Sequence, residues 1–555
     1  MTSIEALRDQ LNVPQSVNVA PYDNLLGLYQ AIISKHGERP AFTALGQTIT
    51  YNDLDEYSDR FAAFLQQHTG LAVGDRIAIQ LPNILQQPVV LLGAIKAGLV
   101  VVNTNPLYTE PELQHQFKDS GAKALVVLAN VADKAAAIID HTDIETVIVT
   151  ELGDLHSPLK GWVLNKAVKY IKKMVPEFTF NDSVNFRSIM RSMSGQKPTK
   201  VQADLEDIAV LQYTGGTTGL SKGAMLTHAN LMANALQSTI FFDSYGMPKV
   251  GALVVQPLPL YHIFAFTVSL ICLSSGSHTL LIPNPRDLPS MVKAMKGKKV
   301  DGICALNTLF VALANNEGFK SLDFSNLQMT LSGGMALASD TAKRWQDITG
   351  CEIYEGYGLT ETSPVVAVCH GSMNVMGSVG VVVPNTQVAI RDEEGQDLPH
   401  GERGELFVKG PQVMKGYWQH DEQTEAAIVD GWLATGDIAL ITDEGVLKIV
   451  DRKKDMILVS GFNVFPNEVE DVALTHPNIV EVAAIGQPDE TSGEVVHLYV
   501  VSNNKDLTEA DVVSHCRHSL AAYKVPKKVF FKDELPKSPV GKVLRRIVKE
   551  QALRA

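Results

Sequence analysis

The stretch at residues 213–224 reads Tyr-Thr-Gly-Gly-Thr-Thr-Gly-Leu-Ser-Lys-Gly-Ala, and no other part of the chain indicates its chemistry so directly. The glycines let the backbone approach an anion and turn its N–H groups toward it. The threonine hydroxyls and the lysine add further donors, and this combination suits a polyphosphate. The candidate phosphate-binding residues are Thr214, Gly215, Gly216, Thr217, Thr218, Gly219 and Lys222.

This loop differs from a Walker A sequence, because Lys222 follows Ser221 and precedes Gly223 instead of completing a Gly-Lys-Ser/Thr run. The apolar run 208–212 before it predicts a buried strand, and a helix is expected to start near His228. A flexible turn between these two elements is the alternative interpretation, and the loop by itself does not decide between them.

Four further motifs follow in order along the chain. They are Gly-Tyr-Gly-Leu-Thr-Glu-Thr at 356–362, Gly-Trp-Leu-Ala-Thr-Gly-Asp at 431–437, Asp-Arg-Lys-Lys-Asp at 451–455 and Pro-Lys-Ser-Pro-Val-Gly-Lys at 536–542. Together with the first loop, they resemble the motifs of the acyl-adenylate-forming superfamily, which contains acyl-CoA synthetases, luciferases and nonribosomal peptide adenylation domains. The stretch 430–464 is especially similar to the signature of bacterial long-chain fatty-acid–CoA ligases.

The chain departs from the common family pattern at a few motif positions. Gly215 stands where serine is common, and Ser221 stands where proline is frequent. Ser538 and Val540 stand where threonine is usual, but both changes keep Lys542 and its flanking glycine. Activity is therefore still expected.

Length and composition set broad limits on the protein class. A chain of 555 residues exceeds one ordinary core and predicts two or more domains. The net charge of −13 argues against a nucleic-acid-binding protein, and five scattered cysteines fit reduced thiols in a cytoplasmic protein. The most apolar region, 251–273, is interrupted by prolines, Tyr261 and His262, whereas a membrane span needs about 20 apolar residues. A buried strand, loop and helix are expected there.

Short apolar runs separated by amphipathic segments predict an α/β fold with parallel strands and crossover helices. Past about residue 375 the pattern changes to antiparallel strands and hairpins, and the last hundred residues indicate a small α+β unit. The expected strands are 76–81, 124–128, 146–149, 208–212, 252–257, 279–282, 302–305, 379–390, 404–408, 438–442, 446–450, 480–485 and 495–501, and the expected C-terminal helices are 467–475 and 507–518.

The resemblance implies a large N-terminal domain over residues 1–451, of which about 375–451 forms a small β-barrel. A small mobile C-terminal domain would follow over 452–555. It also implies a two-step reaction, in which ATP converts a long-chain fatty acid to an acyl-AMP with release of pyrophosphate, and CoA then displaces AMP. The implied cofactors and co-substrates are ATP, Mg²⁺ and CoA.

The resemblance also assigns the nucleotide-binding side chains. Tyr357 would lie against adenine, Thr360 would contact the α-phosphate, and Glu361 would bind Mg²⁺, which is typically held by one or two carboxylates plus phosphate oxygens. Asp437 would accept both ribose hydroxyls, with Arg452 beside it. Outside such motifs, a glutamate at a helix start and an aspartate after glycine are more often solvated or turn residues.

The residues that handle the acyl group are likewise implied by the resemblance. Lys542 would bridge the acyl carboxylate and the α-phosphate, and His262 would lie beside the acyl pocket. Gly333 and Gly334 would let the backbone approach the nucleotide and the carboxylate. Phe266 stands where long-chain members carry an aromatic at the tunnel mouth, although a phenylalanine in so apolar a segment is more often plain core.

The small domain is expected to rotate between the two steps of the reaction. Lys454 occupies the hinge position of the family, and rotation there would remove Lys542 and open a channel for CoA. Gly461 would line that channel, because glycine permits close approach of the pantetheine arm, although it also suits any tight turn.

The segment 161–175 predicts a basic amphipathic helix. Its apolar residues share one broad face at 100° per residue, and Lys166, Lys169, Lys172 and Lys173 share the opposite face. Such a helix in an acidic protein could rest on an anionic membrane, which would place the protein at the inner face of the membrane. The alternative is an ordinary surface helix that covers the core.

Two other functions are alternatives to a fatty-acid–CoA ligase. An enzyme of the same class could load the acyl-adenylate onto a carrier protein in place of free CoA, and a catalytically inactive relative could merely bind nucleotide or lipid. Retention of Lys222, Glu361, Asp437, Arg452 and Lys542 together argues against an inactive relative. The sequence does not reveal the acyl chain length or the oligomeric state.

Overall fold

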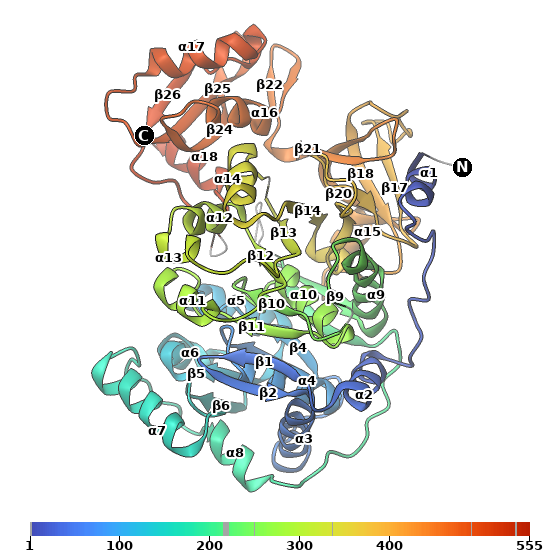
Figure 1. Cartoon of the computed structure of the whole chain (residues 1–555), viewed down its shortest axis with the longest axis vertical. Coiled ribbons are helices and arrows are strands. Elements are labelled where there is room, and N and C mark those ends of the chain that lie inside the picture. The colour runs from blue at the N-terminus through green and yellow to red at the C-terminus, as the bar shows by residue number, and fades with distance from the viewer. Residues whose placement is uncertain are drawn as a thin grey trace.

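The computed structural model describes residues 3–214, 221–248, 250–335, 337–489, 491–538 and 541–554. Figure 1 shows a small C-terminal unit stacked on one end of a larger body. Near the N-terminus, α1 (Ser3–Gln10) lies beside the antiparallel sheet of the large body. The chain then runs along the side of that body to α2 (Leu25–His36).

Two largely parallel sheets form the large body, as the sequence predicts. One has the strand order β16 (Val381–Val382), β15 (Val365–Val368), β14 (Ile353–Gly358), β13 (Met329–Gly333), β12 (Gly302–Ala305), β10 (Leu253–Gln256), β11 (His278–Leu281), β1 (Pro40–Ala44), β2 (Gln47–Thr50). The other has the order β7 (Val184–Asn185), β6 (Thr146–Thr150), β5 (Ala122–Leu128), β3 (Arg76–Gln80), β4 (Val100–Asn103), β8 (Ile208–Tyr213), β9 (Gly223–Thr227). The parallel pairings give way to antiparallel ones at β2, at β9, and at β15 and β16.

Helices between the strands cover both sheets. Two of them, α4 (Gln86–Lys96) and α10 (Ile263–Ser274), are almost entirely buried. The large body also contains α3 (Tyr51–His68), α5 (Glu110–Ser120), α6 (Ala132–Ile138), α7 (Pro158–Lys166), α8 (Phe186–Ser192), α9 (His228–Ser244), α11 (Leu288–Met295), α12 (Asn307–Ala314), α13 (Glu317–Lys320), α14 (Ser339–Thr349) and α15 (Asp421–Ala427). The expected interruption of 251–273 into strand, loop and helix is confirmed by β10 and α10.

The antiparallel part differs from the prediction in several strands. The strand expected at 438–442 begins earlier, at Trp432, and β19 (Ile428–Val429) was not predicted. The expected continuous strand 379–390 is two separate strands, because Pro384 lacks an N–H and Asn385 turns the chain at φ 61°. The first piece, β16, joins the large parallel sheet. The second begins an antiparallel sheet with the order β17 (Gln387–Arg391), β18 (Gly404–Lys409), β20 (Trp432–Ile441), β19 (Ile428–Val429), in which β21 (Leu447–Arg452) also pairs with β20.

The C-terminal unit has its own hydrophobic cores, which draw on residues from Ile457 onward. Its sheet has the order β23 (Phe462–Val464), β22 (Ile457–Val459), β25 (Gly493–Ser502), β24 (Ile479–Asp489), with β26 (Lys528–Phe531) beside β25. Helices α16 (Pro466–Leu474), α17 (Glu509–Ser519) and α18 (Arg545–Arg554) pack on it. The predicted helices and strands of this unit are present within a few residues of the expected bounds.

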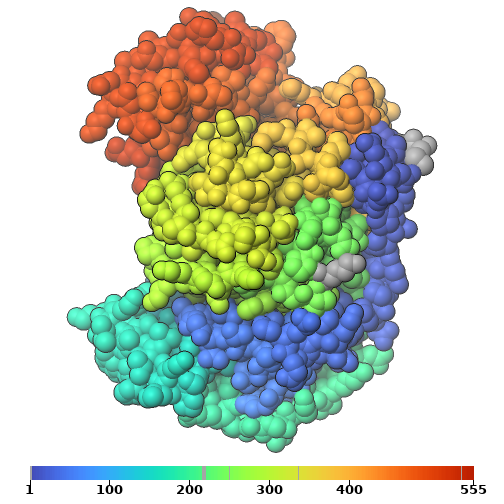
Figure 2. All heavy atoms as spheres, in the orientation of Figure 1, coloured from blue at the N-terminus to red at the C-terminus, as the bar shows by residue number. Residues whose placement is uncertain are grey.

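The segment 161–175 is not the single amphipathic helix that was expected. The α-helix α7 ends at Lys166, and residues Ala167–Ile171 form a π-helical turn in which Lys172 N–H donates to the carbonyl of Ala167 at 2.8 Å. A π-turn shifts the angular positions that follow, so the 100° periodicity stops there. Figures 1 and 2 show this cyan region projecting from one lower corner of the molecule.

Candidate active site

The end of β14, the middle of β20 and the end of β21 bring together the predicted adenine and ribose residues. The buried carboxylate of Asp437 accepts a hydrogen bond from the Tyr357 hydroxyl at 2.6 Å and forms an ion pair with Arg452 Nε at 2.6 Å. Burial, reinforced by the charge of Asp437, raises the pKa of Tyr357 well above its usual range, so this hydroxyl stays a donor. Each carboxylate oxygen keeps a further lone pair that a sugar hydroxyl can use.

The predicted catalytic lysine of the C-terminal unit reaches the large body. Its loop turns at Gly541, whose φ is +89°, and a Cβ at that glycine would lie 3.0 Å from Thr308 Oγ1 at the start of α12. Lys542 and His262 both keep exposed surface, yet the protein around them is dense enough to disfavour their charged forms. Burial, followed by the charge of Lys542, lowers the pKa of His262 to about 4. The imidazole is therefore neutral at physiological pH.

The electrostatic environment of Lys542 connects it to the ribose side of the site as well. Burial and then the nearby positive charge of Arg452 lower the pKa of Lys542, while Asp437 acts in the opposite direction. The charge of this one lysine from the small unit therefore influences His262, and the charge of Asp437 in turn influences the lysine.

The described parts of the phosphate loop are its two ends. Thr214 N–H donates to the Lys222 carbonyl at 2.9 Å, so the loop is closed at its base. Lys222 Nζ lies 4.3 Å from the centre of the Tyr417 ring. The predicted phosphate-binding residues Gly215, Gly216, Thr217, Thr218 and Gly219 lie outside the described residues. The strand β9, which follows this loop directly, was not predicted.

The predicted metal ligand lies in the short 3₁₀ turn Thr360–Thr362 after β14. Glu361 Oε1 accepts a hydrogen bond from the Tyr417 hydroxyl at 2.7 Å. Among the described residues, none donates a hydrogen bond to its other oxygen, Oε2. Glycine is required nearby, because a Cβ at Gly358 would lie 1.9 Å from the Pro364 carbonyl oxygen. The chain can therefore fold back tightly beside Glu361.

The predicted acyl-side glycines lie at the end of β13. Gly333 pairs with Gly356 on β14, and Gly334 has a φ of +79° that favours glycine. A Cβ at Gly333 would meet the ring of Phe264 at 3.2 Å. The aromatic side chain against this glycine is therefore Phe264, which the sequence reasoning missed, whereas Phe266 is fully buried at 1% exposure in the core.

The predicted hinge lies on a short 3₁₀ turn, Lys453–Asp455, directly after β21. Lys454 is exposed, and burial of its neighbourhood lowers its pKa. Gly461 lies in the exposed two-residue turn between β22 and β23 with φ +83°, and open space surrounds its Cα. Arg545, which was not predicted, ties the two sides of the hinge together through Asp451 and Glu470.

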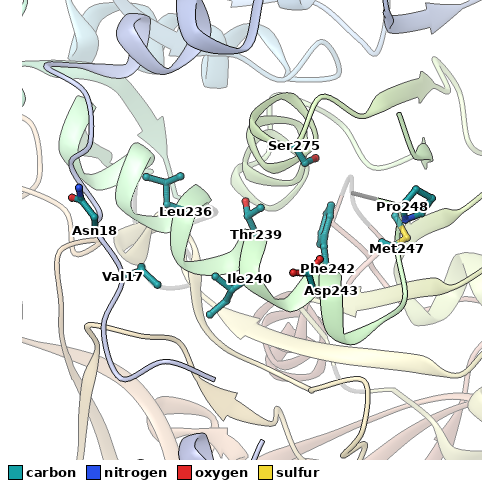
Figure 3. A pocket seen from close by; sticks show the side chains of 10 residues that line it. All are labelled: Val17, Asn18, Leu236, Thr239, Ile240, Phe242, Asp243, Met247, Pro248 and Ser275. Atoms are coloured by element: carbon teal, nitrogen blue, oxygen red, sulfur yellow. The ribbon is translucent and has the colours of Figure 1, made fainter. Parts of the chain in front are cut away.

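A separate surface pocket of about 450 Å³ lies between the N-terminal segment and α9. Figure 3 shows Val17 and Asn18 facing Leu236 and Ile240 across it. The residues that line it include none of the predicted site residues, so it is distinct from the candidate active site.

The junction thus brings together a buried carboxylate, the two ends of a glycine-rich loop and a lysine from the C-terminal unit, the arrangement expected of an adenylate-forming enzyme. The model of the AMP-binding enzyme family matches residues 29–418, and that of the AMP-binding enzyme C-terminal domain matches residues 468–542. The chain belongs to the AMP-binding enzyme family.

Individual relatives extend over nearly the full chain. The long-chain-fatty-acid–CoA ligase of Escherichia coli O6:H1 is 48% identical over 98% of this chain and 97% of its own length. The ATP-bound MatB from Rhodopseudomonas palustris is similar in structure, with a TM-score of 0.80, 29% identity and coverage of 95% of this chain and 99% of that one. A fatty acyl CoA synthetase of Mycobacterium tuberculosis has a TM-score of 0.70, 28% identity and coverage of 95% and 98%.

Proposed function

We propose that this protein is an ATP-dependent long-chain fatty-acid–CoA ligase. A fatty-acid carboxylate oxygen attacks the α-phosphorus of ATP, and the bond to pyrophosphate breaks. The CoA thiol then attacks the acyl carbonyl and loses its proton, and AMP leaves. The observation that carries the proposal is the position of the Lys542 loop, where a Cβ at Gly541 would lie 3.0 Å from Thr308 Oγ1 of the large body, so that the charge of Lys542 lowers the pKa of His262. Such preorganised charge stabilises the transition state without reorganisation cost.

The nucleotide would be held between the end of β14, the middle of β20, the end of β21 and the glycine-rich loop. Asp437 and Arg452 would bind the ribose, Tyr357 would lie against adenine, and Thr360 would contact the α-phosphate. Lys222 and Thr214 are placed at the base of the phosphate loop, where they would hold the β- and γ-phosphates. The described ends of the loop support this assignment.

Glu361 would hold Mg²⁺ together with phosphate oxygens. The carboxylate fits this role, because Tyr417 engages one oxygen and no described residue donates to the other. When bound, the metal would neutralise phosphate charge during adenylation. The residues around Glu361 orient its carboxylate, and Lys222 supplies a second positive charge.

The small domain would be residues 452–555 and the large domain residues 1–451, with Lys454 as the pivot. The separate hydrophobic core beginning at Ile457 supports this division. The present position of Lys542 suits adenylation, and rotation about Lys454 would bring Gly461 to the CoA channel. Since Gly461 lies on an exposed turn with open space around it, a pantetheine arm could pass close by.

His262, Gly333 and Phe264 would border the acyl carboxylate. The neutral His262 ring, with a pKa of about 4, adds no positive charge that would compete with Lys542. The assignment of Phe266 as the gate of the acyl tunnel stays a prediction. Because Phe266 is buried, α10 would have to move for its side chain to open a tunnel.

The function is tested by supplying ATP, Mg²⁺ and CoA with acids from acetate to oleate. We expect pyrophosphate release and acyl-CoA formation that are greatest with the long-chain acids. Pyrophosphate release without a CoA thioester would favour transfer to a carrier protein. Absence of pyrophosphate release with every acid would contradict a catalytic function altogether.

We also propose peripheral contact with anionic membrane through residues 161–175 in a cytoplasmic protein. Within the described ranges, no helix is both long enough and apolar enough to cross a bilayer. The segment instead leaves large apolar side chains exposed beside its lysines, with Ile171 at 80% and Trp162 at 57%. Exposed apolar groups next to basic ones in a chain of net charge −13 suit an anionic lipid surface better than plain packing.

Reversing the basic side chains tests this contact. Changing Lys166, Lys169, Lys172 and Lys173 together to Glu should weaken binding to phosphatidylserine vesicles by more than about 100-fold, since each basic residue contributes about 1 kcal/mol. Activity on vesicle-borne fatty acid should fall with it, and activity on soluble medium-chain acid should hardly change.

A matched control carries the same charge change elsewhere. Exposed lysines in and near α11 and α13 serve this purpose, namely Lys293, Lys296, Lys299 and Lys320. If this control loses vesicle binding to the same extent, the weaker binding of the first variant results from its changed net charge and not from the position of its lysines. Unchanged binding in the first variant would refute the membrane contact.

A further inference from the structure

A short segment after β18 lies against both phosphate-handling parts of the site. Trp418 N–H donates to the Gly223 carbonyl at 2.8 Å, directly beside Lys222. At the other end, Met414 N–H donates to the Glu361 carbonyl at 2.8 Å. Residues 414–418 therefore connect the strand that leaves the glycine-rich loop to the turn that carries Glu361.

The side chain of Tyr417 makes the same connection at the functional groups. Its hydroxyl donates to Glu361 Oε1 at 2.7 Å, and its ring lies 4.3 Å from Lys222 Nζ. Tyr417 is 8% exposed, and its own N–H donates to Thr424 Oγ1 at 2.8 Å, so both ring and backbone are held in place.

We propose that Tyr417 is a positioning residue for adenylation, which holds the carboxylate of Glu361 and the ammonium of Lys222 in fixed places at the polyphosphate. It touches neither reacting atom. This inference rests on the proposed adenylation reaction and adds a residue that the motifs do not contain.

The physical reason is that Tyr417 separates two opposite charges that would otherwise be free to pair. The Tyr417 hydroxyl occupies one lone pair of Glu361 Oε1 and leaves Oε2 available to a metal ion. The face of the Tyr417 ring attracts the Lys222 cation. A ligand carboxylate oriented in this way binds metal more tightly, and loss of such an outer contact typically costs about 10- to 100-fold in metal affinity.

Two variants separate the hydroxyl from the ring. Tyr417→Phe removes the donor and keeps the ring, so we expect the Mg²⁺ concentration that half-saturates pyrophosphate release to rise about 10-fold, with KM for ATP at saturating Mg²⁺ unchanged. Tyr417→Leu removes both contacts, so KM for ATP should also rise by about 3- to 10-fold.

The matched control is Tyr51→Phe, which removes a buried hydroxyl that donates to the Ser277 carbonyl at 2.7 Å in the core. It should lower thermal stability without moving the Mg²⁺ dependence. In a Glu361→Ala background, Tyr417→Phe should have no further effect on Mg²⁺ dependence, because it acts through that carboxylate.

The outcomes distinguish this inference from the proposed function. If the unaltered protein releases no pyrophosphate with ATP and fatty acid, the adenylation reaction itself is refuted. If the unaltered protein is active and Tyr417→Phe keeps its Mg²⁺ dependence, Tyr417 does not position Glu361. An equal shift in Tyr51→Phe would likewise overturn the inference, since general destabilisation would then explain it.

Discussion

Replacing Lys542 by alanine is expected to reduce acyl-adenylate formation by about 10²- to 10³-fold, the usual cost of removing a transition-state contact. The lysine is close enough to His262 and Asp437 for their charges to interact, so its charge is lost where the carboxylate and the α-phosphate would meet. Thioester formation from pre-made acyl-AMP and CoA should be far less affected, because the lysine would leave the site before that step. Pyrophosphate release and thioester formation are measured separately.

Lys537→Ala is the matched control for this experiment. Lys537 lies in the same loop but pairs with Glu481 on β24, an ion pair of the small domain that contributes little to stability. Both half-reactions should persist in it. Equal losses in the two half-reactions of Lys542→Ala would contradict the two-conformation mechanism, whereas a selective loss of adenylation would support it.

Replacing Lys454 by proline is expected to have the opposite selectivity. Proline fixes φ near −65° and also restricts the residue before it, so the turn Lys453–Asp455 could no longer change conformation freely. Adenylation should stay within about 10-fold of the unaltered rate, while thioester formation should fall by about 10²-fold or more, the size of effect that a misplaced group produces. A single-turnover assay with labelled fatty acid would show acyl-AMP accumulating.

Lys454→Ala separates the loss of charge from the loss of rotation. It removes the same ammonium group but leaves φ free, so both steps should proceed. If the alanine variant shows the same block, the charge of Lys454 matters and not the flexibility of the backbone. If both steps of the proline variant stay near the unaltered rate, the pivot lies at another residue.

The strands and the order of the motifs could be read from the sequence because they depend on local pattern. Buried parallel strands are short apolar runs, and β3, β5, β6, β8 and β12 all appear within two residues of their predicted bounds. Helices α16 and α17 of the C-terminal unit lie within two residues of their predicted bounds, whereas α18 was not predicted. Family membership followed from motifs whose order spans the chain.

The local sequence pattern gave wrong elements where a single residue turned the chain or where a neighbouring strand stabilised a segment that the pattern did not mark. Pro384 and Asn385 divided an apolar run that looked continuous, and the π-turn after Lys166 ended a helical periodicity that the sequence carries further. The strand β9 escaped prediction because it pairs with β8 across the loop, and its glycine and threonine composition resembles a turn.

The sequence by itself determined the class of chemistry, since glycines, Lys222, Glu361 and Asp437 occur in motifs that no local rearrangement can hide. Only the tertiary structure decided which side chains act on them. Tyr417 reaches Glu361 across 56 positions and Tyr357 reaches Asp437 across 80. Lys542 belongs to the C-terminal unit, yet its charge lowers the pKa of His262 in the large body. Such contacts depend on how packed sheets and domains meet, and that geometry is the sum of many distant apolar contacts and not of any local run of residues.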